Sequence, residues 1–198
     1  EDRRHRRGGA ARDTGSAAQV VRSYPLIVTS SVGSIGAELC RQVAANRPSR
    51  LVLVERAENN LFEIHSELCG RYSDVEVVPC MADITDVPRI TSVFRKHRPT
   101  VVFHAAAHKH VPMMERNPAE AVKNNILGTQ LVADLADSLA VERFVMISTD
   151  KAVNPTSVMG ATKRAAELYV QALSPQSATD FATVRFGNVL GSAGSVIP

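Results

Sequence analysis

The stretch PLIVTSSVGSIGAELCRQ, residues 25–42, joins an apolar run to an amphipathic segment through a turn that contains two glycines. The run at 25–30 has the length and composition of a buried strand, and the segment at 34–47 has the spacing of a helix. A strand, a glycine-containing turn and a helix in this order are typical of the phosphate-binding turn of dinucleotide-binding proteins. The stretch therefore predicts an α/β fold whose first crossover binds a dinucleotide.

Strand-like and helix-like segments alternate along the rest of the chain. Further strands are expected at 50–55, 75–83, 100–106, 142–149 and 181–189, and further helices at 57–72, 86–97, 118–139 and 159–173. Each crossover is long enough for a helix, so neighbouring strands should run parallel, with helices on both faces of the sheet. We expect a doubly wound, Rossmann-like sheet of order 3-2-1-4-5-6 that binds ligands at the carboxyl ends of its strands.

The composition suits one globular domain, since 44% of the 198 residues are hydrophobic and 22% are charged. Residues 1–22 carry six arginines and three acids, which leaves 17 basic and 17 acidic residues for the remainder. We expect a basic flexible arm or linker at 1–23 and a dinucleotide-binding domain at 24–198, without a nucleic-acid partner. Three cysteines without a C-x-x-C pair, and no apolar run of about 20 residues, favour a cytoplasmic protein without disulfides.

The turn after the first strand provides the expected pyrophosphate site. Gly33 and Gly36 occupy the second and third glycine positions of a T-G-x-x-G-x-x-G pattern. A missing Cβ there lets the backbone approach the pyrophosphate, and the helix amino terminus donates N–H groups to it. Ser30 stands at the first glycine position, where a positive φ would strain its backbone. The residues expected to bind the cofactor in this turn are Thr29, Gly33, Ser34, Ile35 and Gly36.

Acidic residues end the second and third strands. Glu55 follows Gly36 by 19 residues, the distance at which an acid binds the adenosine ribose hydroxyls. This acid favours NAD, while Arg56 beside it leaves NADP as the alternative. Asp83, with Ile84 next to it, is expected near the adenine amino group, and a helix-capping role is the alternative for Asp83.

Four longer motifs follow one another in the chain: GSIGAELCRQ, VVFHAAAHKHVPMMERNPAEAVKNNILGT, FVMISTDKAVNPTSVMGATKRAAE and VRFGNVLGSAGSVIP. With them the chain resembles the CapD-like polysaccharide-biosynthesis family, nucleotide-sugar 4,6-dehydratases of the extended short-chain dehydrogenase/reductase group. The resemblance runs from Leu26 to Pro198. It implies a lyase that uses NAD(P) to eliminate the C6 hydroxyl of a UDP-N-acetylhexosamine of the UDP-GlcNAc type, in surface polysaccharide or glycan biosynthesis.

The resemblance also implies what surrounds this part of the protein. Family members continue into a carboxyl-terminal region that closes over the nucleotide sugar, and many carry an amino-terminal membrane region. We therefore interpret the chain as the truncated, cofactor-binding portion of a larger enzyme and expect it to be inactive alone. Any membrane contact, at the inner face of the membrane, would lie in a region outside this chain. A UDP-sugar substrate and a homo-oligomer are expected.

By the same resemblance, the segment STDKAVNPTSVMGATKR, 148–164, carries the reaction. Asp150 is the expected general acid and Lys151 the expected base, each with a pKa moved toward neutrality by burial and mutual contact. Thr149, with Ser148 as the alternative, would hydrogen-bond the C4 oxygen of the sugar.

The helix after this segment is implied to supply two further residues. Lys163 would hydrogen-bond the nicotinamide ribose. Met159 occupies the position of a tyrosine in simpler relatives, as it does in the larger, membrane-attached branch of the family. It would pack against the sugar or the nicotinamide, and core packing on its own helix is the alternative.

The remaining candidates lie outside these two segments, and for Lys109 a solvated surface position is the alternative. Asn125 is expected to orient the active-site loop, and Val189 to lie near the carboxamide of the cofactor. Three small residues should let the backbone run along the cofactor: Ala105, Ala106 and Ala107. The residues expected to contact the substrate are Lys109, His110 and Asn188.

The motif HAAAHKH raises the question of a metal site formed by His104, His108 and His110. No acid or cysteine stands at a standard zinc-ligand spacing, so we expect no metal. Two other functions remain open at this point. One is a non-catalytic NAD(P)-binding domain, and the other is a sugar-nucleotide epimerase of the same fold, which Lys151 disfavours.

Overall fold

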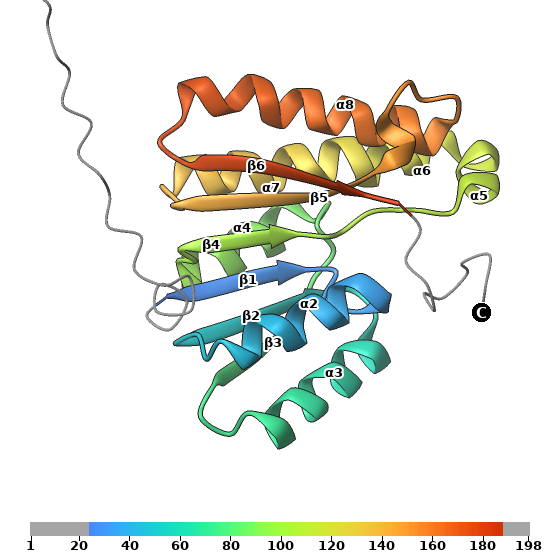
Figure 1. Cartoon of the computed structure of the whole chain (residues 1–198). Coiled ribbons are helices and arrows are strands. Elements are labelled where there is room, and N and C mark those ends of the chain that lie inside the picture. Colours follow the sequence, from blue (N-terminus) through green and yellow to red (C-terminus); the bar gives the residue numbers. More distant parts are fainter. Residues whose placement is uncertain (1–23, 188–198) are drawn as a thin grey trace, which may run out of the picture.

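The computed structural model of the chain describes residues 24–187 and contains one six-stranded parallel sheet (Figure 1). The strands lie in the order β3-β2-β1-β4-β5-β6, which confirms the predicted order. Every neighbouring pair is parallel, as the long helical crossovers require. The strands are β1 Pro25–Thr29, β2 Arg50–Glu55, β3 Glu76–Met81, β4 Val101–His104, β5 Arg143–Thr149 and β6 Asp180–Phe186.

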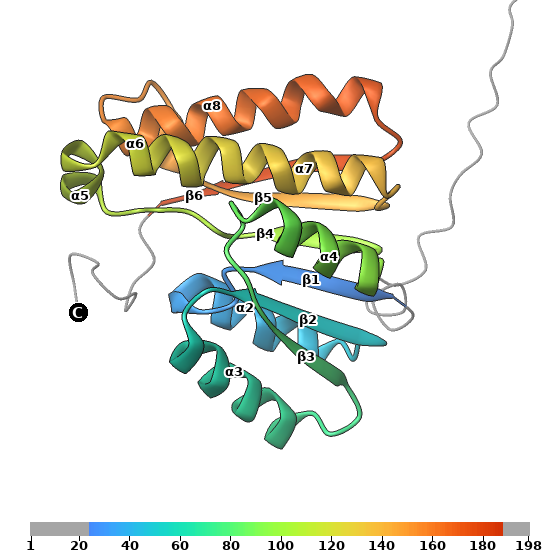
Figure 2. The ribbon, with the colours of Figure 1, turned by 180° about the vertical axis from the view of Figure 1, so that it is seen from behind.

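Helices cover both faces of the sheet, and Figures 1 and 2 show the two sides. Helices α2 (Gly33–Ala45) and α3 (Glu58–Arg71) pack on one face and share an apolar core with it. Helices α4 (Val87–His97), α7 (Thr129–Ser138) and α8 (Val158–Leu173) pack on the other face, over a second and larger core.

The two cores follow from the alternation of side chains along each strand. In β1, Leu26 and Val28 face the core under α2 and α3, whereas Ile27 faces the other core. In β2, Leu53 and Val54 divide in the same way. Because both faces are buried, these strands read as continuous apolar runs, which is what the sequence showed.

One expected helix is interrupted. The helix predicted at 118–139 consists of α6 (Pro118–Ala121), a π-helical turn η1 (Val122–Gly128) and α7. A short helix that the sequence did not predict, α5 (Val111–Arg116), precedes them. A proline stands in the first turn of both α5 and α6, where its missing N–H leaves no hydrogen bond unmade.

Several strands are shorter than predicted at their carboxyl ends. β3 ends at Met81 and β4 at His104, because the chain then turns into loops that border the ligand edge. β6 ends at Phe186, and positions 188–189 of the strand predicted there lie outside the described residues. Positions beyond 187, which include Asn188 and Val189, lie outside the described residues, as does the expected basic arm at 1–23. Within residues 24–187 no helix is both long enough and apolar enough to cross a membrane.

Candidate active site

The carboxyl ends of the parallel strands meet at one edge of the sheet, at the right of Figure 1. Thr29, Glu55 and Thr149 are the last residues of β1, β2 and β5. The strand order reverses between β1 and β4, and such a reversal places a ligand crevice at this edge. The fold therefore gathers most of the expected cofactor and catalytic residues on one side of the molecule.

The turn between β1 and α2 has the backbone of a phosphate-binding turn. Gly33 has a φ of +80° and nothing lies within 4 Å of the place where its Cβ would be, so the backbone is open to a ligand there. Ser30 has a φ of +54°, so a serine holds a left-handed conformation in which its Cβ is strained. The structure confirms the positive φ that would strain Ser30.

Gly36 has a packing role in this turn. A Cβ on Gly36 would lie 1.8 Å from the backbone oxygen of Ser30. The missing side chain therefore lets helix α2 pack against its own preceding turn. The expected contact of Gly36 with the pyrophosphate stays a prediction, and of the two glycines Gly33 is the one with open space at its Cβ position.

The start of α2 directs backbone N–H groups toward this turn. The N-cap residue Val32 offers no side-chain acceptor to the N–H groups of the first turn, which includes Ser34 and Ile35. Ser31 is fully buried beside the turn, and its hydroxyl has no hydrogen-bond partner. Backbone donors at a helix start, an open glycine and an unpartnered buried hydroxyl fit the pyrophosphate of a dinucleotide.

Glu55 lies at the end of β2 and is nearly buried. Its Oε1 accepts hydrogen bonds from the backbone N–H groups of Arg56 and Ala57, at 2.9 and 3.0 Å. These bonds fix the carboxylate at the ligand edge. The Arg56 guanidinium lies 3.5 Å from the Asp83 carboxylate, so the cation beside Glu55 is already paired with an acid.

Asp83 closes a tight turn and does not cap a helix. Its Oδ1 accepts from both the backbone N–H and the hydroxyl of Thr85, each at 2.8 Å, whereas Asp86 caps α4 by accepting from Arg89. The helix-capping alternative for Asp83 is therefore wrong. Burial alone would raise the pKa of Asp83, but the bonds from Thr85 and the charge of Arg56 outweigh it and lower the pKa.

The loop after β4 is held by one buried amide. Asn125 accepts a hydrogen bond from the His108 N–H at 2.8 Å and donates to the His108 carbonyl at 3.1 Å. It also donates to the Thr162 hydroxyl on α8, at 3.1 Å. Asn125 stands in the π-helical turn η1, and thereby ties the loop of Ala105, Ala106 and Ala107 to α8. This geometry agrees with the loop-orienting role expected for Asn125.

His104 bridges the two halves of the sheet. Its Nδ1 lies 2.9 Å from the Thr29 hydroxyl and its Nε2 lies 2.9 Å from the Thr129 hydroxyl, so both ring nitrogens are bonded to threonines. Complete burial, with the charge of Lys163 as a second cause, lowers the pKa of His104 to about 3. Among the described residues, no three His, Cys, Asp or Glu side chains gather in a way that could hold a metal ion.

Thr149, Asp150 and Lys151 form a short hydrogen-bonded series at the mouth of β5. The Thr149 hydroxyl donates to Asp150 Oδ1 at 2.9 Å, and Lys151 Nζ donates to the same oxygen at 3.2 Å. The exposed fractions of the acid and amine side chains are 55% and 39%. Because the site is open, hydrogen bonds from Thr149 and Lys151 dominate and lower the pKa of Asp150. The expected shift of the Asp150 pKa toward neutrality is wrong for this state.

Helix α8 places two more candidates below that series. Lys163 is buried, and its ammonium donates to the carbonyl of Ile147 at 2.8 Å. Burial lowers the pKa of Lys163 to about 8, although the nearby Glu167 carboxylate raises it. Met159 is buried in a small cluster with Met114 and Ala121, which favours the core-packing alternative for Met159.

Ser148 faces away from the reacting edge. Its hydroxyl donates to the buried carboxylate of Glu167 at 2.6 Å, so of the two hydroxyls considered for the C4 oxygen it is Thr149 that lies with Asp150. Gly160 lies under the segment 149–151, since a Cβ there would be 2.3 Å from the backbone oxygen of Lys151. Lys109 and His110 are exposed at the end of the loop after β4.

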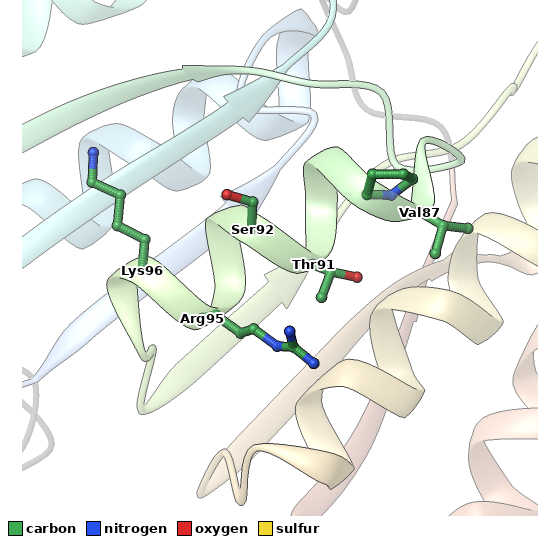
Figure 3. A pocket seen from close by; sticks show the side chains of 6 residues that line it. Val87, Thr91, Ser92, Arg95 and Lys96 are labelled. Carbon is green, nitrogen blue, oxygen red and sulfur yellow. The ribbon is translucent and has the colours of Figure 1, made fainter.

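One surface depression lies away from this edge. It has a volume of about 700 Å³ and is open along α4, where it is lined by Val87, Pro88, Thr91, Ser92, Arg95 and Lys96. Figure 3 shows that Arg95 and Lys96 point to opposite sides of this helix. The side chains do not converge, so the depression has no set of groups aimed at one ligand.

Two buried polar residues were not predicted from the sequence, His104 as a bridge and Glu167 as a bonding centre. Glu167 stands four residues after Lys163, in the same helical row and beside the buried residues Ala166 and Val170. A charged residue at an otherwise apolar position of an amphipathic helix was the signal that could have identified it. For His104, the motif HAAAHKH suggested only a possible metal ligand and did not indicate its hydrogen bonds to two threonines.

Comparison with known proteins identifies the family of the chain. Residues 26–198 match the family model described as polysaccharide biosynthesis protein. The chain is 54% identical over 175 residues to the capsular polysaccharide biosynthesis protein CapD of Staphylococcus aureus, covering 87% of this chain and 29% of that protein. It is 37% identical over 181 residues to a UDP-N-acetylglucosamine 4,6-dehydratase (inverting) of Campylobacter jejuni, covering 87% of this chain and 51% of that protein.

A solved structure agrees with these matches. The X-ray structure of Pen from Bacillus thuringiensis superimposes with a TM-score of 0.81 at 34% identity, covering 89% of this chain and 55% of the other. The chain thus spans about half or less of the length of the relatives it matches. Because the family match covers most of the chain, the chain belongs to the polysaccharide biosynthesis family of extended short-chain dehydrogenases/reductases, as its motifs predicted.

Proposed function

We propose that the protein containing this chain is a nucleotide-sugar 4,6-dehydratase that acts on a UDP-N-acetylhexosamine with NAD as cofactor. The observation that carries the proposal is the hydrogen-bonded series Thr149–Asp150–Lys151 at the ligand edge, with the buried Lys163 bonded to the carbonyl of Ile147 on the same strand as Thr149. An elimination between C5 and C6 requires a base and an acid side by side, and this series offers both. The 37% identity to a 4,6-dehydratase over 87% of the chain supports the same reaction.

The residues present fit a dinucleotide. Gly33 and the first turn of α2 would hold the pyrophosphate, Glu55 the adenosine ribose and Lys163 the nicotinamide ribose. Glu55 would repel a 2′-phosphate, and Arg56 is paired with Asp83, so NAD is favoured over NADP. When bound, the nicotinamide supplies a hydride acceptor and donor.

The ionised pair suggests how both catalytic protonation states arise. In the open site Lys151 donates to Asp150, and the lowered pKa of Asp150 keeps the acid as a carboxylate. A substrate that covers the pair removes water, which disfavours both charges. Transfer of the shared proton along the 3.2 Å hydrogen bond would then give a neutral amine and a protonated acid. These are the forms required of the base at C5 and of the acid at the C6 hydroxyl.

The test uses the purified full-length protein with NAD and UDP-N-acetylglucosamine, in ordinary water and in deuterium oxide. A 4,6-dehydratase releases a product lighter by one water, with a 4-keto group and with solvent deuterium at C5. An epimerase would return a sugar of unchanged mass without deuterium at C5. A product of unchanged mass, or no turnover, would overturn the proposal.

A further inference from the structure

Glu167 on α8 is the most deeply buried carboxylate within residues 24–187, with no exposed surface. It accepts hydrogen bonds from three side chains. Ser148 donates its hydroxyl to Oε1 at 2.6 Å. Arg185 donates through Nε and a terminal nitrogen to the two carboxylate oxygens, at 2.8 and 2.5 Å. Arg164, one turn back on the same helix, donates to Oε2 at 3.0 Å.

These bonds join three elements just below the candidate active site. Ser148 of β5 and Arg185 of β6 are direct partners in the sheet register, and Glu167 reaches both from α8. Ser148 immediately precedes Thr149, the start of the catalytic series. Arg185 lies two residues before Gly187. A Cβ on Gly187 would lie 3.7 Å from Oδ2 of Asp150. The hydrogen bonds of Glu167 therefore hold β5 one residue before Thr149. They hold β6 two residues before Gly187, which lies next to Asp150.

A charge cluster at this place is not explained by stability alone. The neighbouring interior positions on α8, Ala166 and Val170, are apolar, and well-packed apolar residues stabilise such positions as well as a buried ion pair does. Burial would raise the pKa of Glu167, yet the bonds from Arg185, Ser148 and Arg164 bring it down to about 2. The carboxylate thus remains charged and fully bonded, which fixes the direction of every group that it contacts.

We propose that Glu167 is a positioning residue, which clamps the carboxyl ends of β5 and β6 together and so holds Thr149, Asp150 and Lys151 at the substrate edge. The inference rests on the proposed function for the reaction that it serves. Glu167 itself touches neither substrate nor cofactor. It acts through Ser148, which it holds on the inner face of β5, and through Arg185, which it holds opposite.

The experiment compares Glu167→Gln with the unaltered full-length protein. The amide keeps the size of the side chain but cannot accept from both arginine nitrogens and Ser148 together. We expect kcat for water loss to fall about 10- to 100-fold, as small misplacements of catalytic groups do, while the KM for the UDP-sugar and the affinity for NADH change little. Hydrogen exchange should rise at residues 148–152 and 185–187 and remain unchanged in β3, at the opposite edge.

Two further variants separate positioning from folding. Glu63→Gln removes an exposed carboxylate on α3 and should change none of these readouts. Glu167→Leu combined with Arg185→Leu replaces the ion pair by apolar side chains, and should keep the melting temperature near that of the unaltered protein without restoring kcat. Recovery of kcat in this double variant would overturn the inference, because the pair would then be only a packing element.

The remaining outcomes distinguish the two proposals. If the unaltered protein eliminates water and Glu167→Gln does so equally fast, the positioning role is wrong and the proposed function stands. If the unaltered protein eliminates no water, the proposed function is wrong. Hydrogen exchange then decides on the clamp, and unchanged exchange at 148–152 in Glu167→Gln would overturn it as well.

Discussion

The two halves of the sheet present ligand groups in different ways. Around β1, β2 and β3, the groups at the ligand edge are mainly backbone: the left-handed Ser30, the open Gly33 and the start of α2. Around β4, β5 and β6, they are side chains held by other side chains, as Asn125 and Glu167 show. Phosphates can be bound by a correctly shaped backbone, whereas proton transfer requires particular side chains in fixed directions. The difference teaches which substitutions should affect binding and which should affect chemistry.

The largest expected effect concerns only the half of the sheet formed by β4, β5 and β6. Lys151→Ala removes the expected base and the donor to Asp150. We expect the rate of water elimination to fall about 100-fold or more, with NADH affinity unchanged. Steady-state kinetics and NADH titration of the full-length protein measure the two quantities. Lys96→Ala, at an exposed position on α4, is the matched control. An equal loss of NADH binding in Lys151→Ala would show that the halves are not separate.

The next effect concerns only the half of the sheet formed by β1, β2 and β3. Gly36→Ala places a Cβ 1.8 Å from the Ser30 oxygen, so α2 and its turn must move apart. We expect a loss of about 3 kcal/mol in the free energy of unfolding, together with weaker NADH binding. Gly70→Ala is the control, because nothing lies within 4 Å of its added Cβ in helix α3. That control should be neutral or stabilising, and equal denaturant midpoints for the two variants would contradict the packing role of Gly36.

A smaller effect concerns the residue that joins the halves. The pKa of His104 is about 3 in the folded protein and 6.5 for an ordinary histidine. Below pH 6.5, His104 therefore binds a proton in the unfolded chain but stays neutral in the folded protein. Stability should therefore fall as the pH drops from 6.5 toward 3, by about 1.4 kcal/mol at pH 5.5 from this group. Denaturant unfolding at pH 7.5 and 5.5 measures it.

The variant His104→Gln isolates that contribution. Burial also lowers the pKa of His97 and of His108, so several histidines contribute to the same pH window. His104→Gln should lower stability at both pH values but should lose less between them than the unaltered protein. His65→Gln, on α3, should lose as much as the unaltered protein. A loss of stability between pH 7.5 and 5.5 that is as large in His104→Gln as in the unaltered protein would exclude a contribution from His104.

The sequence predicts the first half better than the second, for a physical reason. The strand order, the glycine turn and the acid at Glu55 depend on local patterns, since apolar runs and glycine spacing report strands and tight turns directly. The strained φ of Ser30 could be anticipated because the pattern names a glycine at that position. Gly36 could not be interpreted fully, because the atom that it must avoid belongs to the folded turn.

In the second half the decisive contacts join residues far apart in the chain. Glu167 meets Ser148 and Arg185 across 19 and 18 positions, and Asn125 meets Thr162 across 37. No local pattern reports such partners. The pKa direction of Asp150 was wrong for the same reason, because burial was inferred from a motif whereas exposure depends on what surrounds the loop. The break of the helix predicted at 118–139 likewise places Asn125 against a loop that the local pattern does not show.

The smallest predicted effect comes from removing the backbone strain at Ser30, in the turn after β1. Ser30 holds a φ of +54°, a conformation that disfavours any residue with a Cβ by about 1 kcal/mol. Ser30→Gly should therefore raise the free energy of unfolding by about that amount and should not weaken NADH binding, while kcat remains the same. Ser49→Gly is the control: its φ is not positive, so the added freedom should slightly destabilise the protein. If Ser30→Gly lowers stability instead, the serine makes a contact that offsets its strain, and the backbone alone does not determine the shape of the turn.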